Sequence, residues 1–277
     1  MIYVGKTQTL QAKRITPHGV YLVCEDDQEV LLPNSYVPDN LPMNQSIDVF
    51  VYHDSEGRLT ATTLQPYCQL NEFGFLKVKD STKHGAFLDW GLAKDLLVPK
   101  AQQAFNLLPE QTVLVYVYLD EKSNRLAAST KWTGFLANDR PDYEENSAVN
   151  ALVFEETEIG FKCIVNHQHL GMLYKNELFK FIQPGDRLTV FVNKVRDDGK
   201  IDLRIHANGY DAQIDEQTNT LLQALTINNG FLRLTDKSSP EQIKALLGMS
   251  KKGFKKALGN LYRQKKVTLT NDGVQLN

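Results

Sequence analysis

The side chains best suited to chemistry in this sequence are two aromatic rings with lysines beside them. His84 and Phe87 lie on one short segment, and Lys77 and Lys83 come just before it. An exposed ring can stack on any nucleobase, which contributes about 1–3 kcal/mol per base. A nearby lysine can neutralise a backbone phosphate. The combination predicts contact with a single-stranded nucleic acid.

The alternative for these aromatic residues is burial. Phe87 lies between the apolar Ala86 and Leu88, with Trp90 shortly after it, and a strand that is buried on one face hides every second side chain. Either ring could therefore belong to the core of a small β-barrel. The residues alone leave both interpretations open.

A second candidate is a cluster of lysines near the C-terminus. Residues 231–277 hold 10 Lys and Arg against 3 Asp and Glu, although the whole chain has a net charge of −2. Such asymmetry indicates a local anionic partner, whereas the alternative is a solvated helix face. A lysine-rich helix start with almost no Arg, Asn or Gln favours phosphate contact over base reading. The lysines are Lys251, Lys252, Lys255 and Lys256.

Signatures of catalysis are weak. The sequence has no phosphate-binding Walker loop, no glycine-rich dinucleotide turn after a strand and no H-E-x-x-H motif. His167 and His169 lack a matching set of Cys or carboxylate partners, so we interpret them as a polar loop. We expect no catalytic residue, no metal and no cofactor. A nuclease with an unrecognised site is the enzymatic alternative.

The cysteines and the hydropathy pattern indicate the compartment. Cys24, Cys68 and Cys163 are odd in number and widely spaced, which is typical of small buried residues in a reducing environment. No run of eighteen apolar residues occurs, and the first residues lack the apolar core of a signal peptide. We expect a cytoplasmic monomer that does not contact membranes.

The elements that must position these side chains recur three times. A glycine followed by a short apolar strand occurs at Gly19, Gly85 and Gly160, which are 66 and 75 residues apart. A hairpin with a basic residue just after its turn repeats at nearly the same spacings, 67 and 75 residues. These basic residues are Arg58, Arg125 and Lys200.

Each repeat contains five candidate strands with alternating apolar residues, which indicates an OB-type barrel. After residue 209 the period becomes helical. Ser239, Pro240 and Gln242 form a capping box for one helix. Ser250 caps the next helix, whose apolar stripe is Phe254, Leu258, Leu261 and Tyr262.

The predicted fold class is mainly β with an α/β C-terminus. Three tandem five-stranded OB-fold barrels of the S1 type precede a winged helix-turn-helix domain. The predicted boundaries are 1–65, 66–133 and 147–209 for the barrels, 134–146 for a linker and 210–277 for the winged helix.

Two stretches resemble known families. His84–Leu88, followed by Asp95–Pro99, resembles an S1 RNA-binding domain. Asp236–Gly259 resembles the bacterial conserved virulence factor B (YitL-like) family, and the similarity extends over essentially the whole chain. That resemblance implies three S1 domains and a winged helix, RNA binding, an effect on gene expression and no established catalytic activity.

The S1 resemblance also implies which residues face RNA. S1 domains bind single strands through two aromatic residues near the second strand, a His after the third strand, and an acid and a base around the last hairpin. No repeat has the full set of matching residues, but the second keeps most of them and is the expected main contact. The matching residues are His18, Tyr21 and Arg58 in the first repeat, His84, Phe87 and Arg125 in the second, and Lys162, Tyr174 and Lys200 in the third.

The predicted function is therefore non-enzymatic binding of single-stranded RNA through the S1 barrels and the basic winged helix. We expect this binding to affect gene expression after transcription. Structured RNA or a duplex is a further expected partner of the winged helix. The alternative is a DNA-binding transcription regulator whose barrels contact proteins. A triplicated barrel favours RNA, because tethered weak sites on one strand act together.

Overall fold

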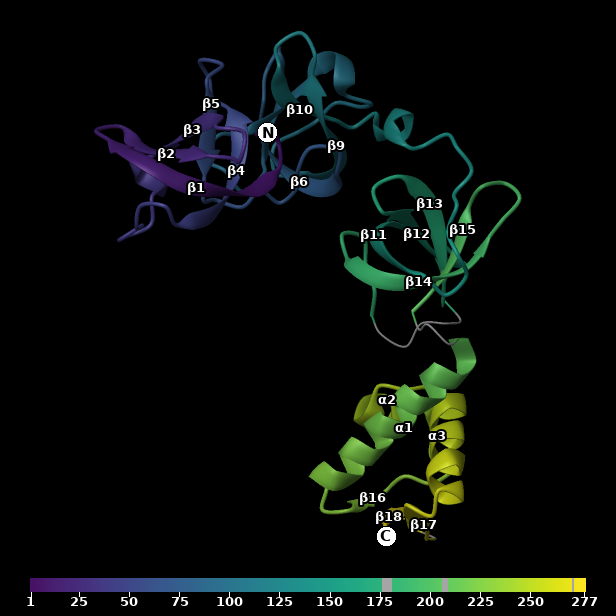
Figure 1. Cartoon of the computed structure of the whole chain (residues 1–277). Coiled ribbons are helices and arrows are strands. Elements are labelled where there is room, and N and C mark those ends of the chain that lie inside the picture. Colours follow the sequence, from purple (N-terminus) through teal and green to yellow (C-terminus); the bar gives the residue numbers. More distant parts are fainter. Residues whose placement is uncertain (176–180, 206–208, 271) are drawn as a thin grey trace. The chain divides into compact units, whose positions relative to one another are not determined.

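The structure is a computed structural model that describes residues 1–175, 181–205, 209–270 and 272–277. The chain divides into two compact units, Met1–Ala137 and Asn138–Asn277 (Figure 1). The division falls inside the stretch predicted to be a linker.

The first repeat is a closed barrel. Its strands are β1 (Thr7–Thr16), β2 (Gly19–Val23), β3 (Glu29–Pro33), β4 (Ser46–His53) and β5 (Leu59–Thr62). They follow the order β1-β2-β3-β5-β4, and parallel pairing of Leu31 with Thr60 joins β3 to β5. Alternation places Leu22 and Leu32 in the barrel core. A short 3-10 helix, η1 (Asn34–Tyr36), follows β3.

The second repeat has the same five strands in an open sheet. They are β6 (Phe73–Ser81), β7 (Gly85–Asp89), β8 (Leu96–Pro99), β9 (Thr112–Asp120) and β10 (Arg125–Ser129), in the order β10-β9-β6-β7-β8. The five strands of the predicted S1 barrel are present, but no ladder joins β8 to β10 in the described part of the chain, so this repeat is a half-barrel. The end of β10 bonds instead to the 3-10 helix η2 (Lys100–Gln102), where the Ser129 hydroxyl donates to Gln102 Oε1 at 2.8 Å.

The first two repeats share a core. Phe50 of β4 is fully buried and meets the Trp90 ring edge to face, with ring centroids 5.7 Å apart. Trp90, at 3% exposure, is therefore a core residue, as the burial alternative predicted. Gly5 fits against the next repeat only because it lacks a side chain: a Cβ there would lie 2.6 Å from Leu70 Cβ.

The third repeat is a second closed barrel. It comprises β11 (Ala148–Glu156), β12 (Gly160–Val165), β13 (His169–Tyr174), β14 (Arg187–Val195) and β15 (Ile201–Arg204), with β13 parallel to β15. Before it, the 3-10 helix η3 (Trp132–Phe135) packs its two aromatic rings on β6 and β9 of the second repeat. These two rings therefore belong to the packing of the second repeat.

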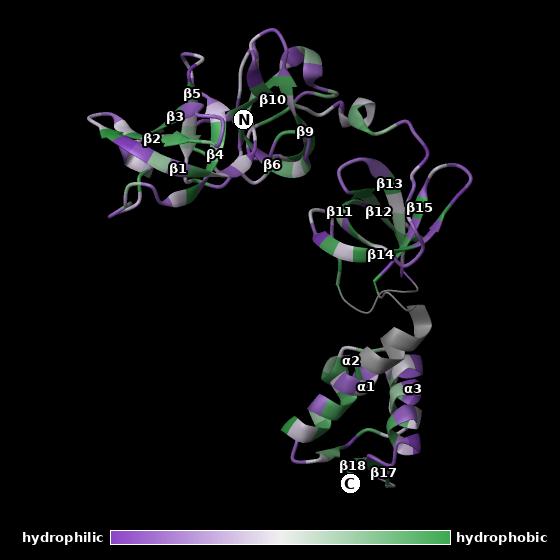
Figure 2. Cartoon of the chain, viewed as in Figure 1, coloured by the Kyte–Doolittle hydropathy of each residue, from purple (hydrophilic) through white to green (hydrophobic). Residues whose placement is uncertain are grey.

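The C-terminal segment is the predicted winged helix. It comprises α1 (Gly209–Ile227), β16 (Phe231–Leu232), α2 (Pro240–Leu247), α3 (Lys251–Arg263), β17 (Val267–Leu269) and β18 (Val274–Leu276). The Ser239 capping box and the Ser250 cap are both present, and Gly248 ends α2 in the left-handed conformation at φ 67°. Hydrophilic and hydrophobic residues interleave along α3 (Figure 2). Tyr262 is 56% exposed, so its predicted place on the buried stripe is wrong.

Tyr262 departs from the stripe for a geometric reason. Leu258 and Leu261 already fill the buried face at the end of α3, and Tyr262 lies one further position around the helix. Its ring therefore faces solvent beside Arg263.

Candidate nucleic-acid interface

Phe87 lies on the outer surface of the second repeat. Its neighbours Ala86 and Leu88 point into the core, so the period of two along β7 directs the Phe87 ring outward. It is half-buried and stands between Asp80 on β6 and Leu97 on β8. This position leaves part of the ring available to stack with a ligand.

Exposed lysines lie on β6 and on the turn that precedes Phe87. His84 and Lys83 are exposed on the turn that leads into β7, and Lys83 makes no ion pair within the described part of the chain. Lys77 pairs with Glu110 at 2.6 Å, and its side chain is exposed. Exposed ion pairs contribute little free energy, so a phosphate can replace the Glu110 carboxylate.

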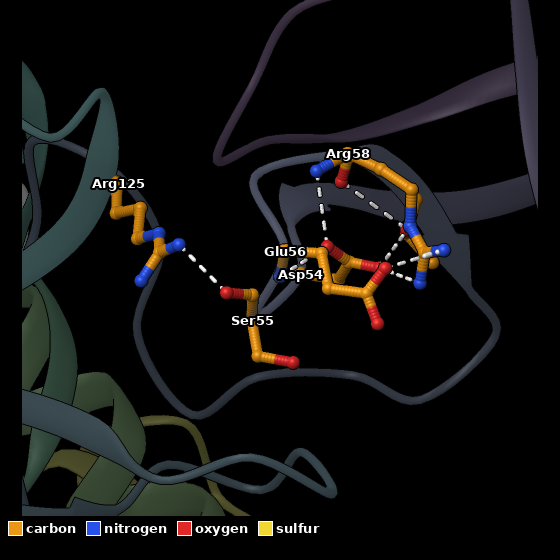
Figure 3. Close-up of polar contacts among 6 residues, drawn as sticks. Asp54, Ser55, Glu56, Arg58 and Arg125 are labelled. Atoms are coloured by element: carbon orange, nitrogen blue, oxygen red, sulfur yellow. Dashed lines mark hydrogen bonds and ion pairs between the residues drawn. The ribbon is translucent and has the colours of Figure 1, made fainter.

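Arg125 is engaged in a contact that the sequence did not indicate. Its Nη2 donates to the backbone carbonyl of Ser55, in the β4–β5 turn of the first repeat, at 2.7 Å (Figure 3). A guanidinium has five N–H donors, so this bond leaves donors for a phosphate. Arg125 therefore lies at the junction of the two repeats.

The turn that holds Ser55 is itself an ion-pair cluster. Arg58 donates to Asp54 Oδ2 through Nε at 2.9 Å and Nη2 at 2.7 Å, and also pairs with Glu56 (Figure 3). Burial by itself raises the pKa of Asp54, but the hydrogen bonds from Arg58 and from nearby backbone N–H groups outweigh it and lower that pKa. The structure thus places Arg58 among carboxylates.

The other first-repeat candidates differ in accessibility. His18 is exposed on the β1–β2 turn, at the place that His84 occupies in the second repeat. The Arg14 guanidinium covers the Tyr21 ring at 3.6 Å from its centroid and pairs with Glu29 at 2.8 Å. A base that stacks on Tyr21 would have to displace Arg14.

Acidic partners occupy all three candidates of the third repeat. Lys162 bonds to both carboxylate oxygens of Glu155 at 2.8 and 3.0 Å. The Tyr174 hydroxyl donates to Asp202 at 3.0 Å, and Lys200 pairs with Asp198 at 3.1 Å. Both candidate lysines of this barrel are therefore paired, whereas the second repeat also offers Lys83, which forms no ion pair in the described part of the chain.

The four candidate lysines of α3 differ in how exposed they are. Lys252 and Lys255 are exposed, whereas Lys251 and Lys256 are half-buried at the margins of the packed face. Sequence reasoning missed three further exposed cations at the C-terminal end of α3 and just after it. Their signal was the basic run after the apolar stripe, and they are Arg263, Lys265 and Lys266.

Neither a metal-binding cluster nor a membrane-spanning helix occurs among the described residues. No group of three or more His, Cys, Asp or Glu residues could hold a metal ion in the portion that the structure describes. Within the same portion, no helix is both long and apolar enough to cross a membrane.

Comparisons with known proteins match both parts of the chain. The family profile described as an S1 domain matches residues 4–64 and 74–131, and the profile described as a CvfB-like winged helix domain matches residues 219–276. The third barrel lies outside the residues matched by the S1 profile.

Individual relatives match nearly end to end. The uncharacterized protein YitL of Bacillus subtilis is 27% identical over 96% of this chain and 91% of its own length. Conserved virulence factor B of Staphylococcus saprophyticus is 25% identical over 99% of this chain and 94% of its own length. A solved multidomain protein with nucleic acid binding domains from Streptococcus pneumoniae is 23% identical, covers 99% of this chain and 98% of its own, and has a TM-score of 0.39.

Proposed function

Because this chain belongs to the proteins that join S1 domains to a CvfB-like winged helix domain, we propose that it binds single-stranded RNA. The second repeat is the main S1 contact, and the basic surface of the winged helix holds backbone phosphates. The protein acts in the cytoplasm without catalysis, and it affects gene expression after transcription. The predicted domain boundaries are part of this proposal.

One observation supports the choice of the second repeat. Phe87 faces outward on β7, and His84 and Lys83 are exposed on the turn that leads into this strand, whereas Tyr21 is covered by Arg14 and Lys162 is bound by Glu155. Stacking needs an accessible ring and phosphate contact needs an accessible cation. Among the described residues considered for contact, the second repeat combines an outward ring, Phe87, with an exposed lysine that forms no ion pair, Lys83.

The test is a gel shift with single-stranded RNA, single-stranded DNA and duplex DNA of equal length. We expect the full chain to bind the single-stranded RNA most tightly, with affinity that falls steeply as salt rises. Tightest binding to the duplex would support the second candidate, a DNA-binding transcription regulator. The exposed Lys252 and Lys255 on α3, the helix that winged domains place in the major groove, favour that second candidate.

Incubation of labelled RNA with the protein and Mg²⁺ tests the assignment as a non-enzyme. We expect the RNA to stay intact, and cleavage that scales with protein concentration would contradict the assignment.

A further inference from the structure

The same hydrogen-bonded turn joins the first two strands of all three repeats. Its sequences are Thr16-Pro17-His18-Gly19, Thr82-Lys83-His84-Gly85 and Thr157-Glu158-Ile159-Gly160. In each turn the threonine hydroxyl donates to the carbonyl of the glycine three residues later. The three distances are 2.9, 3.0 and 2.7 Å. Because the bond recurs at three separate places in one chain, it is a defining feature of the turn.

Two further contacts hold each turn on its other side. The carbonyl of the third residue accepts the N–H of the residue that follows the third strand; for His84 this donor is Lys100, at 3.2 Å. The glycine lies against the third strand so closely that a Cβ at Gly85 would be 2.4 Å from the Val98 carbonyl oxygen. The backbone of the turn is thereby fixed, and the side chain of the third residue faces solvent.

In the second repeat the Thr82 hydroxyl secures the backbone on both sides of His84. It accepts the His84 N–H at 3.3 Å and donates to the Gly85 carbonyl at 3.0 Å. His84 is exposed, and the chain then enters β7, where Phe87 points outward. A loop that is fixed before binding loses less conformational freedom when the ligand arrives.

We propose that Thr82 is a positioning residue that holds His84 beside Phe87 for a nucleotide of the bound strand. The proposal rests on the proposed function and deepens it. The third residue of the turn determines what the turn offers the ligand. His84 and His18 present a planar ring that can stack or donate a hydrogen bond, whereas Ile159, 62% exposed, can do neither. The turn of the third repeat therefore keeps the threonine–glycine bond without the contact, and there the Thr157 hydroxyl accepts the Gly160 N–H instead of the N–H of the third residue.

That difference supplies a matched control. Thr82→Val and Thr157→Val each remove the hydroxyl that bonds the glycine carbonyl in corresponding turns of two repeats, at nearly constant side-chain shape, and Thr82→Ser keeps the hydroxyl. The measurement is the fluorescence anisotropy of a labelled single-stranded RNA of roughly 12 nucleotides, within the range that one OB-fold barrel covers. The full chain is used throughout, and thermal unfolding is recorded for every variant.

We expect Thr82→Val to weaken RNA binding about three- to tenfold, the factor that one neutral hydrogen bond typically controls. Thr82→Ser and Thr157→Val should bind like the unmodified chain. In a His84→Ala background, Thr82→Val should cause no further loss, because the residue it positions is gone.

Two results would overturn the role of Thr82 and leave the proposed function of the second repeat intact. One is an equal loss from Thr82→Val with and without His84, which would mean that the hydroxyl has only a structural role. The other is full affinity of Thr82→Val when His84→Ala weakens binding. If neither His84→Ala nor Phe87→Ala changes RNA binding, the proposed role of the second repeat fails, and this proposal fails with it.

Discussion

At the scale of single residues, the alternation of apolar side chains predicts which groups face outward, but it does not predict their partners. Ala86 and Leu88 are inward, so Phe87 is outward, and this follows from the sequence. The cover of Tyr21 by Arg14 does not follow, since it depends on how two strands register. The same holds for Arg125 and Ser55, which are 70 residues apart.

Replacement of Phe87 by alanine should weaken RNA binding by about 1–3 kcal/mol, because one stacked base loses its platform. Phe105→Ala is the matched control, since Phe105 is 55% exposed in a loop of the same repeat and outside the proposed contact. Titration of labelled single-stranded RNA measures both variants, and circular dichroism checks their folds. Equal affinities for the two variants would contradict the assignment.

The three cysteines should differ sharply in reactivity. Burial raises the pKa of the Cys163 thiol to about 12, which leaves almost no thiolate at neutral pH. Burial also raises the pKa of Cys24, but hydrogen bonds from the backbone of Asp26 and Gln28 and from the Met1 amino group outweigh it, so the net shift is downward. Iodoacetamide followed by peptide mass spectrometry should therefore modify Cys24 first.

The control for that experiment is the denatured chain, in which all three cysteines should react alike. Modification of Cys163 as fast as Cys24 in the folded protein would be inconsistent with the buried site described here.

At the scale of elements, local signals predicted the helix ends and failed where the outcome depends on distant contacts. Ser239 and Ser250 cap their helices as expected because a cap needs only residues within one turn. The open sheet of the second repeat could not be predicted, since the pairing of β10 depends on Gln102 in η2. The repeat spacing still predicted all five strands.

Charge reversal on α3 tests the basic surface of the winged helix. Lys252→Glu with Lys255→Glu should leave the domain folded, because exposed substitutions change stability by about 0.5 kcal/mol or less. The slope of log affinity against log salt should become shallower by about 0.7 for each phosphate of a single strand that a lysine no longer neutralises. A control pair, Lys237→Glu with Lys244→Glu, makes the same charge change elsewhere in the domain.

If the two charge-reversed pairs show the same salt slope, α3 is not a specific contact surface. Weaker binding confined to one duplex DNA sequence would instead favour the regulator alternative.

At the scale of the whole molecule, the sequence predicted three repeats and a winged helix, but not that the first two repeats share a core. Phe50 and Trp90 each look like the core residue of a separate barrel, and only the fold brings their rings together. Because cooperative units follow packed cores, Met1–Ala137 should open as one unit.

Phe50→Ala should therefore destabilise both of the first two repeats, by about 3–5 kcal/mol for a buried Phe. Hydrogen exchange read by mass spectrometry should show faster exchange in β6–β10 as well as in β1–β5. Leu173→Ala, in the separate core of the third barrel, is the control and should leave residues 1–137 unchanged. Faster exchange confined to β1–β5 in Phe50→Ala would refute the shared unit.

Photo-crosslinking shows directly whether the second repeat is the main contact for a single strand. The full chain is irradiated with single-stranded RNA that carries thio-substituted uridines, and the modified peptides are identified by mass spectrometry. We expect the dominant crosslinks to fall on the segment with His84 and Phe87, and to disappear with competing unlabelled RNA. Crosslinks confined to the third barrel or to the winged helix would contradict the proposed role of the second repeat.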